Sequence, residues 1–149
     1  MEKKPRINVL GSSHFMHEMV AAKQKLCEMG YEGTIHPHYE AHVRGDLPEI
    51  RERWANGEKA ALKREYNYLK HHYADILASE AILFINSTKN GVENYIGGNV
   101  LIEMGQAYVH DKKMFLMYDL PKESAYFDEI ASMDPICLKG RIEDIKKYI

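Results

Sequence analysis

The chain has very few cysteines: only Cys27 and Cys137 occur among its 149 residues, both beside apolar neighbours. Two such cysteines argue against a disulfide framework, and we expect them to be buried free thiols in a reducing compartment. No apolar run approaches the length needed to span a bilayer, and no signal-peptide pattern is visible. We therefore expect a cytoplasmic protein without a membrane partner.

An excess of charge of either sign is also missing. The formal net charge is −2 at pH 7, which gives no electrostatic reason to expect a nucleic-acid partner. Internal repeats and low-complexity segments are absent as well. The length suits one domain with one core, and we treat residues 1–149 as that single domain.

What is present is an alternation of apolar runs and amphipathic stretches. The apolar runs predict five strands, at 7–10, 34–39, 81–86, 114–118 and 135–138. The stretches between them predict helices at about 14–29, 58–79, 97–110, 126–133 and 141–149, and a short helix that begins at Pro48. This alternation predicts a three-layer α/β sandwich with a five-stranded parallel sheet, in the flavodoxin-like order 2-1-3-4-5.

Several details of these elements can also be predicted. Ser12 or Ser13 is expected to cap the first helix, and Pro37 places the strand at 34–39 at an edge or weakens it. The segment 40–56 is polar, and we interpret it as a lid or a contact arm. The core stripe of the helix at 58–79 is expected to contain six residues: Leu62, Tyr66, Leu69, Tyr73, Ile76 and Leu77.

The rest of the chain is organised around the stretch from Gly97 to Tyr108, which lies between two strands and is expected to be their crossover helix. Its apolar stripe has helical spacing and comprises Val100, Leu101, Met104, Ala107 and Tyr108. Glu103 falls at the margin of this stripe, near the helix N-terminus, where the macrodipole favours a carboxylate. Ligands of open parallel sheets bind beyond the carboxyl ends of the strands, where this helix begins.

A carboxylate at that position could attack the anomeric carbon of a sugar. By spacing alone, a helix-surface glutamate is the simpler explanation of Glu103. The N–H groups of Gly11-Ser12-Ser13 could hold an anion or a sugar hydroxyl, or could form a plain capping turn.

Other residues also have two interpretations. Asp75, and His72 one turn earlier, could point toward the same crevice or lie on the surface. The aromatic residues Phe15, Tyr39, Trp54 and Tyr95 could stack a nucleobase or anchor loops. The eight histidines occur in scattered pairs, and we expect no metal site from them.

Four features occur together in one series along the chain. They are a Gly-Ser loop after the first strand, an acid (Glu80) before the Ala-Ile-Leu-Phe-Ile strand, the run Glu-Met-Gly-Gln-Ala at 103–107, and an apolar strand after Lys112-Lys113. This series resembles the nucleoside 2-deoxyribosyltransferase-like superfamily, which includes deoxynucleoside monophosphate N-glycosidases. The resemblance spans nearly the whole chain, and its tightest motif is Glu-x-Gly-x-Ala.

The resemblance implies that Glu103 is a nucleophile that releases the base and forms a glycosyl-enzyme ester, which a second base or water resolves. It places Gly11, Ser12 and Phe15, and by extension Ser13, in the loop that meets sugar and base. Gly98 and Asn99 would then lie beside the sugar.

Two positions depart from the family pattern. Gly97 stands where members often carry an aspartate or serine, and His72 stands where they often carry an aspartate. Asn99, Asp75 or His72 could therefore assist departure of the base.

The resemblance thus predicts an N-glycosidase or nucleoside deoxyribosyltransferase acting on a small nucleoside or nucleotide, without a cofactor. Members usually complete their sites from a neighbouring subunit, so it also implies a homodimer or a larger homo-oligomer. The competing hypothesis is a non-catalytic nucleotide-binding or sensor protein on the same fold. A flavodoxin-like FMN binder fits less well, because no loop carries a phosphate-binding serine and threonine cluster.

Overall fold

The computed structural model describes residues 3–149, which build a five-stranded, all-parallel sheet. Its strands are β1 (Arg6–Gly11), β2 (Glu32–Thr34), β3 (Ala81–Ile85), β4 (Lys113–Leu116) and β5 (Ile136–Cys137). Their order across the sheet is β2-β1-β3-β4-β5, which confirms the predicted topology. The two central strands pair from Ile7 opposite Ala81 to Gly11 opposite Ile85.

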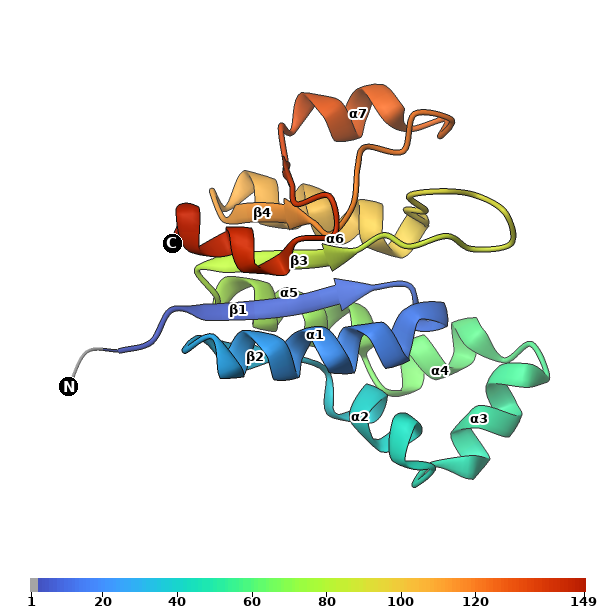
Figure 1. Ribbon diagram of the computed structural model, residues 1–149. Helices are drawn as coiled ribbons and strands as arrows, with labels where there is room; N and C mark the ends of the chain where they lie inside the picture. Colours follow the sequence, from blue (N-terminus) through green and yellow to red (C-terminus); the bar gives the residue numbers. More distant parts are fainter. Residues whose placement is uncertain (1–2) are drawn as a thin grey trace.

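Helices cover both faces of the sheet, so the fold is the predicted three-layer α/β sandwich (Figure 1). On one face, α1 (Met16–Glu28) and the 3-10 helix η2 (Ile142–Lys147) pack against the strands. On the other face lie α5 (Tyr68–Leu77), α6 (Gly98–Val109) and α7 (Phe127–Ser132). Successive residues of β1 serve opposite layers, because Val9 belongs to the first core and Leu10 to the second.

The turn after β1 forms as its sequence predicts. Ser12 precedes the 3-10 helix η1 (Ser13–Phe15), and its Oγ accepts a hydrogen bond from the N–H of His14 at 3.2 Å. This bond satisfies one of the unpaired N–H groups at the helix start. Of the two serines considered, Ser12 is therefore the cap.

The predicted strand at 34–39 is wrong beyond its first residue. β2 ends at Thr34, and Pro37 is the first residue of α2 (Pro37–Arg44). Nδ1 of His36 accepts the N–H of His38 at 3.1 Å and so caps this helix. Proline suits a first helical turn because the N–H it lacks would have no partner there. The local chemistry thus favours a helix over an edge strand.

The predicted helix at 58–79 is two helices, α4 (Lys59–Glu65) and α5. Asn67 between them has a φ of 53°, a left-handed conformation that an α-helix cannot continue through. As a result, Leu62 and Ile76 are buried as predicted, whereas three members of the predicted core stripe are 37–43% exposed: Tyr66, Leu69 and Leu77.

The chain between β2 and α5 forms an arm. It consists of α2, α3 (Pro48–Ala55) and α4, and α3 begins at Pro48 as predicted. We call residues 37–65 the α2–α4 arm. In Figure 1 it extends at the lower right, on the side toward which the strand arrows point. The segment that the sequence left least defined therefore lies beside the carboxyl ends of the strands.

Three smaller predictions need correction. Cys27 is exposed on α1 and Cys137 is half-buried, although both are free thiols as expected. Tyr108, expected in the buried stripe of α6, is 49% exposed. The C-terminal helix predicted at 141–149 is the shorter 3-10 helix η2. Among residues 3–149, no helix combines the length and apolar character needed to cross a membrane.

Candidate active site

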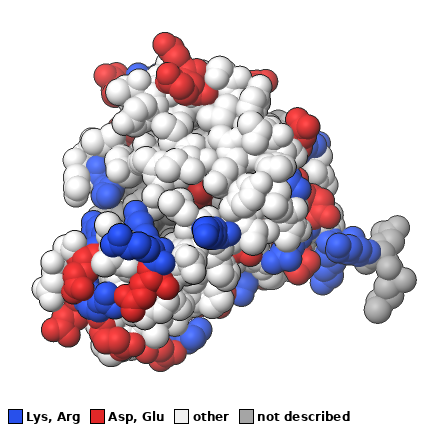
Figure 2. Space-filling model, turned by 180° about the vertical axis from the view of Figure 1, so that it is seen from behind, with Lys and Arg blue, Asp and Glu red and all other residues white. Residues whose placement is uncertain are grey.

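A hollow of about 410 Å³ opens at the carboxyl ends of β1 and β3. Its walls come from the loop after β1, the α2–α4 arm, the first turns of α5, the loop before α6 and the N-terminal half of α6. We call this hollow the cleft. Figure 2 shows the molecule from behind, with basic side chains gathered beside a hollow, next to the part of the molecule at the lower left of the view. The cleft occupies the position at which open parallel sheets bind ligands.

Glu103 lines the cleft from the second turn of α6. Only 2% of the residue is exposed, so it lies deeper than the margin position that its spacing predicts. Its Oε2 atom is buried and has no hydrogen-bond partner among the described residues. A buried carboxylate oxygen without a partner costs free energy, and such groups are concentrated at functional sites.

His72 is the nearest titratable partner of Glu103. Its Nδ1 lies 3.6 Å from Oε1 of Glu103, and the residue is 4% exposed. The other ring nitrogen, Nε2, is buried without a partner among the described residues. Each residue of the pair therefore keeps one buried polar atom available to a bound molecule.

Aromatic rings surround this pair. Tyr68 stacks on His72 at 6.3 Å between ring centroids, and His36 meets it edge-on at 5.5 Å. Burial lowers the pKa of His36 to about 3, and the neighbouring histidines add to this shift, so His36 is neutral at pH 7. Burial raises the pKa of Tyr39, and the charge of Glu103 raises it further. The Tyr39 hydroxyl is therefore a neutral hydrogen-bond donor near the carboxylate.

A side chain at Gly97 would meet the ring of Tyr95. A Cβ built on Gly97 would lie 2.8 Å from the hydroxyl oxygen of Tyr95, closer than real Cβ atoms approach. The Phe15 ring meets the Tyr95 ring edge-on, at 6.5 Å between centroids. The Tyr95 hydroxyl thus occupies the space that a side chain at 97 would need.

The structure brings most of the sequence-predicted candidates into one cleft. Besides Glu103 and His72, the lining contains six of them: Gly11, Ser12, Ser13, Gly97, Gly98 and Asn99. Two candidates do not line it. Phe15 is 3% exposed and packs in the core behind Tyr95.

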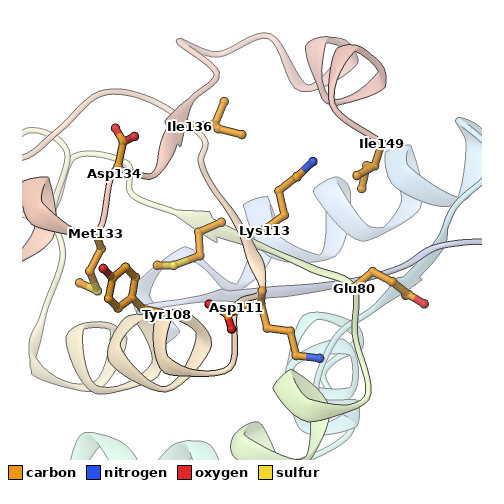
Figure 3. A pocket seen from close by; sticks show the side chains of 10 residues that line it. Glu80, Tyr108, Asp111, Lys113, Met133, Asp134, Ile136 and Ile149 are labelled. Carbon is orange, nitrogen blue, oxygen red and sulfur yellow. The ribbon is translucent and has the colours of Figure 1, made fainter.

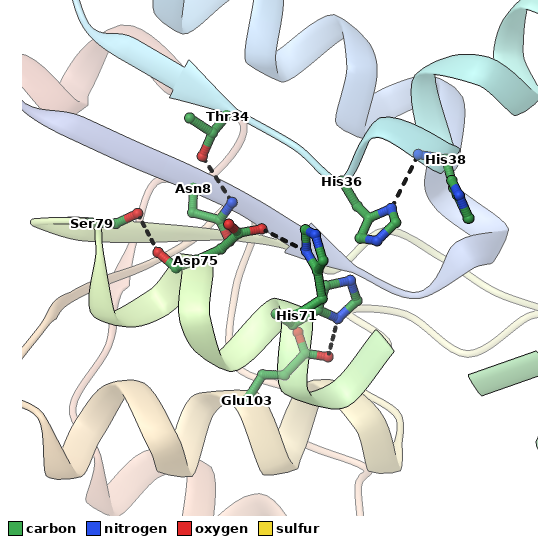
Figure 4. Close-up of polar contacts among 9 residues, drawn as sticks. Asn8, Thr34, His36, His38, His71, Asp75, Ser79 and Glu103 are labelled. Atoms are coloured by element: carbon green, nitrogen blue, oxygen red, sulfur yellow. Dashed lines mark hydrogen bonds and ion pairs between the residues drawn. The ribbon is translucent and has the colours of Figure 1, made fainter. Parts of the chain in front are cut away.

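Asp75 is the other candidate that does not line the cleft. Its carboxylate lies 3.6 Å from Nδ1 of His71 (Figure 4). Both residues line a separate shallow hollow, together with Lys23. The reason is the direction of α5, which runs back across the sheet and leads into the amino end of β3. Residues later in α5 therefore lie farther from the cleft than His72.

Three charged lining residues escaped the sequence prediction: Lys59, Lys63 and Lys89. The first two lie on α4 and the third in the loop after β3. Their local sequence carries no signal that distinguishes them from surface lysines. Only the placement of the arm against the loop brings them together.

A second hollow, of about 460 Å³, lies at the opposite end of the sheet (Figure 3). Two of its charged groups already serve the fold. The Glu80 carboxylate accepts the N–H of Arg6 at 2.6 Å, and Nζ of Lys113 donates to the carbonyl of Tyr148 at 2.9 Å. It contains none of the unpartnered buried side-chain atoms found among the described residues, so the cleft is the better candidate.

The described residues contain no group of three His, Cys, Asp or Glu side chains arranged to hold a metal ion. Comparison with protein-family models, with curated proteins and with solved structures found no match. The chemistry of the cleft must therefore be argued from its own residues.

Proposed function

We propose that this protein is a cytoplasmic enzyme that cleaves or transfers the N-glycosidic bond of a nucleoside or nucleoside monophosphate. One observation carries the proposal: a buried carboxylate with an unpartnered oxygen, that of Glu103, lines a cleft at the carboxyl ends of the sheet. Its helix carries the Glu-Met-Gly-Gln-Ala run on which the family resemblance rests.

The reaction has two steps. Oε2 of Glu103 attacks the anomeric carbon of the pentose while the bond from that carbon to the base breaks, and the base leaves with the bonding electrons. The result is a glycosyl ester on Glu103. Water or a second base then attacks the same carbon, the ester bond breaks, and the carboxylate is restored, while the proton released by the attacking group passes to the residue that protonated the departing base. Water as the acceptor makes the enzyme a hydrolase, and a base makes it a transferase.

His72 is our candidate for the group that supplies a proton to the departing base. Of the three groups considered, Asp75 lies outside the cleft and the amide of Asn99 is not an acid. His72 remains, 3.6 Å from Glu103 and with Nε2 unpartnered. An imidazolium there would donate to a ring nitrogen of the base as the bond breaks.

An apolar hollow of about 190 Å³ adjoins the cleft and supports a nucleobase as part of the ligand. It shares Tyr39, Trp54 and Tyr68 with the cleft, and Met16 adds a further apolar contact. Flat aromatic walls suit a planar heterocycle, because ring faces stack favourably. The pentose would then lie between this hollow and Glu103.

The test is a panel of ribo- and deoxyribonucleosides and their 5′-monophosphates, with free base measured by chromatography. The wild type should release base from at least one member, with or without an added acceptor base. Glu103→Gln should release none while still binding that substrate. Absence of base release from the whole panel would refute the enzymatic proposal.

A non-catalytic nucleotide-binding protein is the second candidate, and one observation favours it. Of the described residues that line the cleft, Glu103 is the only acid, whereas glycosidases commonly use two carboxylates. On this alternative, a nucleotide binds with the same affinity to the wild type and to Glu103→Gln, and it remains intact in both cases.

We further propose a homodimer through the outer face of α5 and α6. This face presents Leu69, Leu77 and Ile102, 38–49% exposed, and Val109, 72% exposed. Grouped apolar residues of this kind on a surface are typical of interfaces. Ile102 also lines the cleft, so a partner on this face would reach the edge of the site.

A further inference from the structure

The rim of the cleft carries three lysines outside the ion pairs of the described residues. Lys59, Lys63 and Lys89 line the cleft, and none forms an ion pair with a described residue. Arg53 on the same arm differs, because it is paired with Glu58 at 3.2 Å and Glu65 at 2.8 Å. We call the three lysines the lysine triad.

Two members of the triad lie over aromatic rings. Nζ of Lys59 lies 5.8 Å from the centroid of the Trp54 ring, and Nζ of Lys89 lies 4.8 Å from that of Tyr95. Both rings line the cleft. A cation over an aromatic face keeps its charge while its position is restricted, so the two ammonium groups are positioned at the rim.

The three ammonium groups act on one another. Burial lowers the pKa of Lys63, and the charges of Lys59 and Lys89 lower it further, while Glu103 opposes the shift. Lys63 therefore lies close enough to the other three charges to be affected by each of them. Clustered like charges destabilise a fold, and a bound anion would remove that penalty.

We propose that the lysine triad binds a phosphate group, so that the ligand of the cleft is a phosphorylated nucleoside with its 5′-phosphate at the rim. This assignment rests on the proposed function, because it takes the pentose to lie at Glu103. A nucleoside without phosphate leaves the triad unneutralised. A phosphate bound to Lys63 and Lys89 links the α2–α4 arm to the loop before α6, on opposite sides of the cleft.

The site differs from the family position considered above, where an aspartate or serine stands six residues before the glutamate. That position is Gly97 here, and Tyr95 fills the adjacent space. In this protein, the lysines of α4 and of the loop after β3 contact the anion instead. Lysine suits this role because its ammonium group is a compact charge with three donors.

The test uses Glu103→Gln, so that the ligand stays intact, and isothermal titration calorimetry with matched deoxyribonucleosides and 5′-monophosphates. The 5′-monophosphate of the preferred base should bind at least about tenfold more tightly than its nucleoside, since charge-assisted bonds are the stronger ones. Lys63→Met and Lys89→Met in this background should remove that advantage. Lys146→Met, a change at an exposed lysine of η2, should not.

Lys63→Met also gives a readout that does not depend on the ligand. Its removal relieves like-charge repulsion, so the melting temperature without ligand should stay the same or rise. A fall would contradict the repulsion that we infer. If this variant does not fold, Lys89→Met in the loop provides the same binding test.

The two proposals can fail separately. Equal affinity for nucleoside and 5′-monophosphate, or an undiminished phosphate advantage in both lysine variants, overturns the phosphate site even if wild-type protein releases base. Tight, lysine-dependent nucleotide binding without base release overturns the enzymatic proposal and leaves the phosphate site standing.

Discussion

Oε1 of Glu103 lies 3.6 Å from Nδ1 of His72 across the contact between α6 and α5, and both residues are at least 95% buried. Each residue also has one buried polar atom, Oε2 of Glu103 and Nε2 of His72, without a hydrogen-bond partner among the described residues. This geometry underlies the first two predictions.

Glu103→Gln should reduce base release by on the order of 10³-fold or more, because an amide cannot form the glycosyl ester. The variant also removes one partner of the buried Glu103–His72 contact, so its free energy of unfolding should fall, by up to about 3 kcal/mol. Chromatography of the released base and urea denaturation measure the two effects. A variant that retains wild-type turnover would exclude Glu103 as the nucleophile.

His72→Gln should slow base release by about 10²- to 10⁴-fold, the range expected for loss of a general acid. The adjacent His71→Gln is the matched control, because His71 is exposed and pairs with Asp75 outside the cleft. Rates should be measured with good and poor leaving bases. The loss should be smaller for bases that depart without protonation, and an equal loss for all bases would argue against acid catalysis.

Gly97→Ser should lower the free energy of unfolding by about 1–3 kcal/mol, because its Cβ meets the Tyr95 hydroxyl at 2.8 Å. Adding Tyr95→Phe should recover part of this loss, since it deletes that hydroxyl. Gly98→Ala is the control, because no atom lies within 4 Å of a Cβ there. Thermal melts suffice, and equal destabilisation at both glycines would contradict the steric argument.

Stability should fall as the pH drops below about 6.5. Burial lowers the pKa of His36 from 6.5 to about 3, so between these values the unfolded chain binds a proton that the folded protein does not. The expected slope is on the order of 1 kcal/mol per pH unit below pH 6. Urea denaturation at pH 7.5, 6.0 and 5.0 measures it.

His36→Asn is the informative variant for this slope. Asparagine can cap α2 in place of the His36 ring, which accepts the N–H of His38, but it does not titrate. The pH dependence should become shallower, and the stability at pH 7.5 should fall, because the smaller side chain loses the packing of a buried ring. His38 and His42 have pKa values lowered in the same direction, so some slope should remain. An unchanged slope would show that His36 is not its main source.

Val109→Asp should convert the proposed dimer to a monomer, because it places a charge on the most exposed apolar residue of α6. Tyr148→Asp is a control on the opposite layer, where Tyr148 follows η2 and is 45% exposed. Light scattering coupled to size exclusion gives the mass of each. A wild-type protein that is monomeric at all concentrations would exclude the dimer.

The order of the sheet, its parallel strands and the three layers were predictable from the sequence, because they depend on local apolar periodicity and on general rules for connections. The same holds for the Ser12 cap and for the helix that begins at Pro48. Local sequence patterns gave the wrong secondary structure where a segment can adopt either of two backbone conformations. Pro37 can begin a helix or weaken a strand, and a single left-handed residue, Asn67, divides one amphipathic stretch into two helices.

Local sequence patterns identify the residues that could carry chemistry: a glutamate on a crossover helix and a glycine-serine turn after the first strand. Which of them meet depends on how the elements pack. This packing buries Glu103 against His72, turns Asp75 away along α5, and sets three lysines at the cleft by laying the α2–α4 arm beside the loop before α6. The two differ because sequence periodicity reflects only neighbours within a few turns, whereas a site depends on packing between segments that lie far apart in the chain.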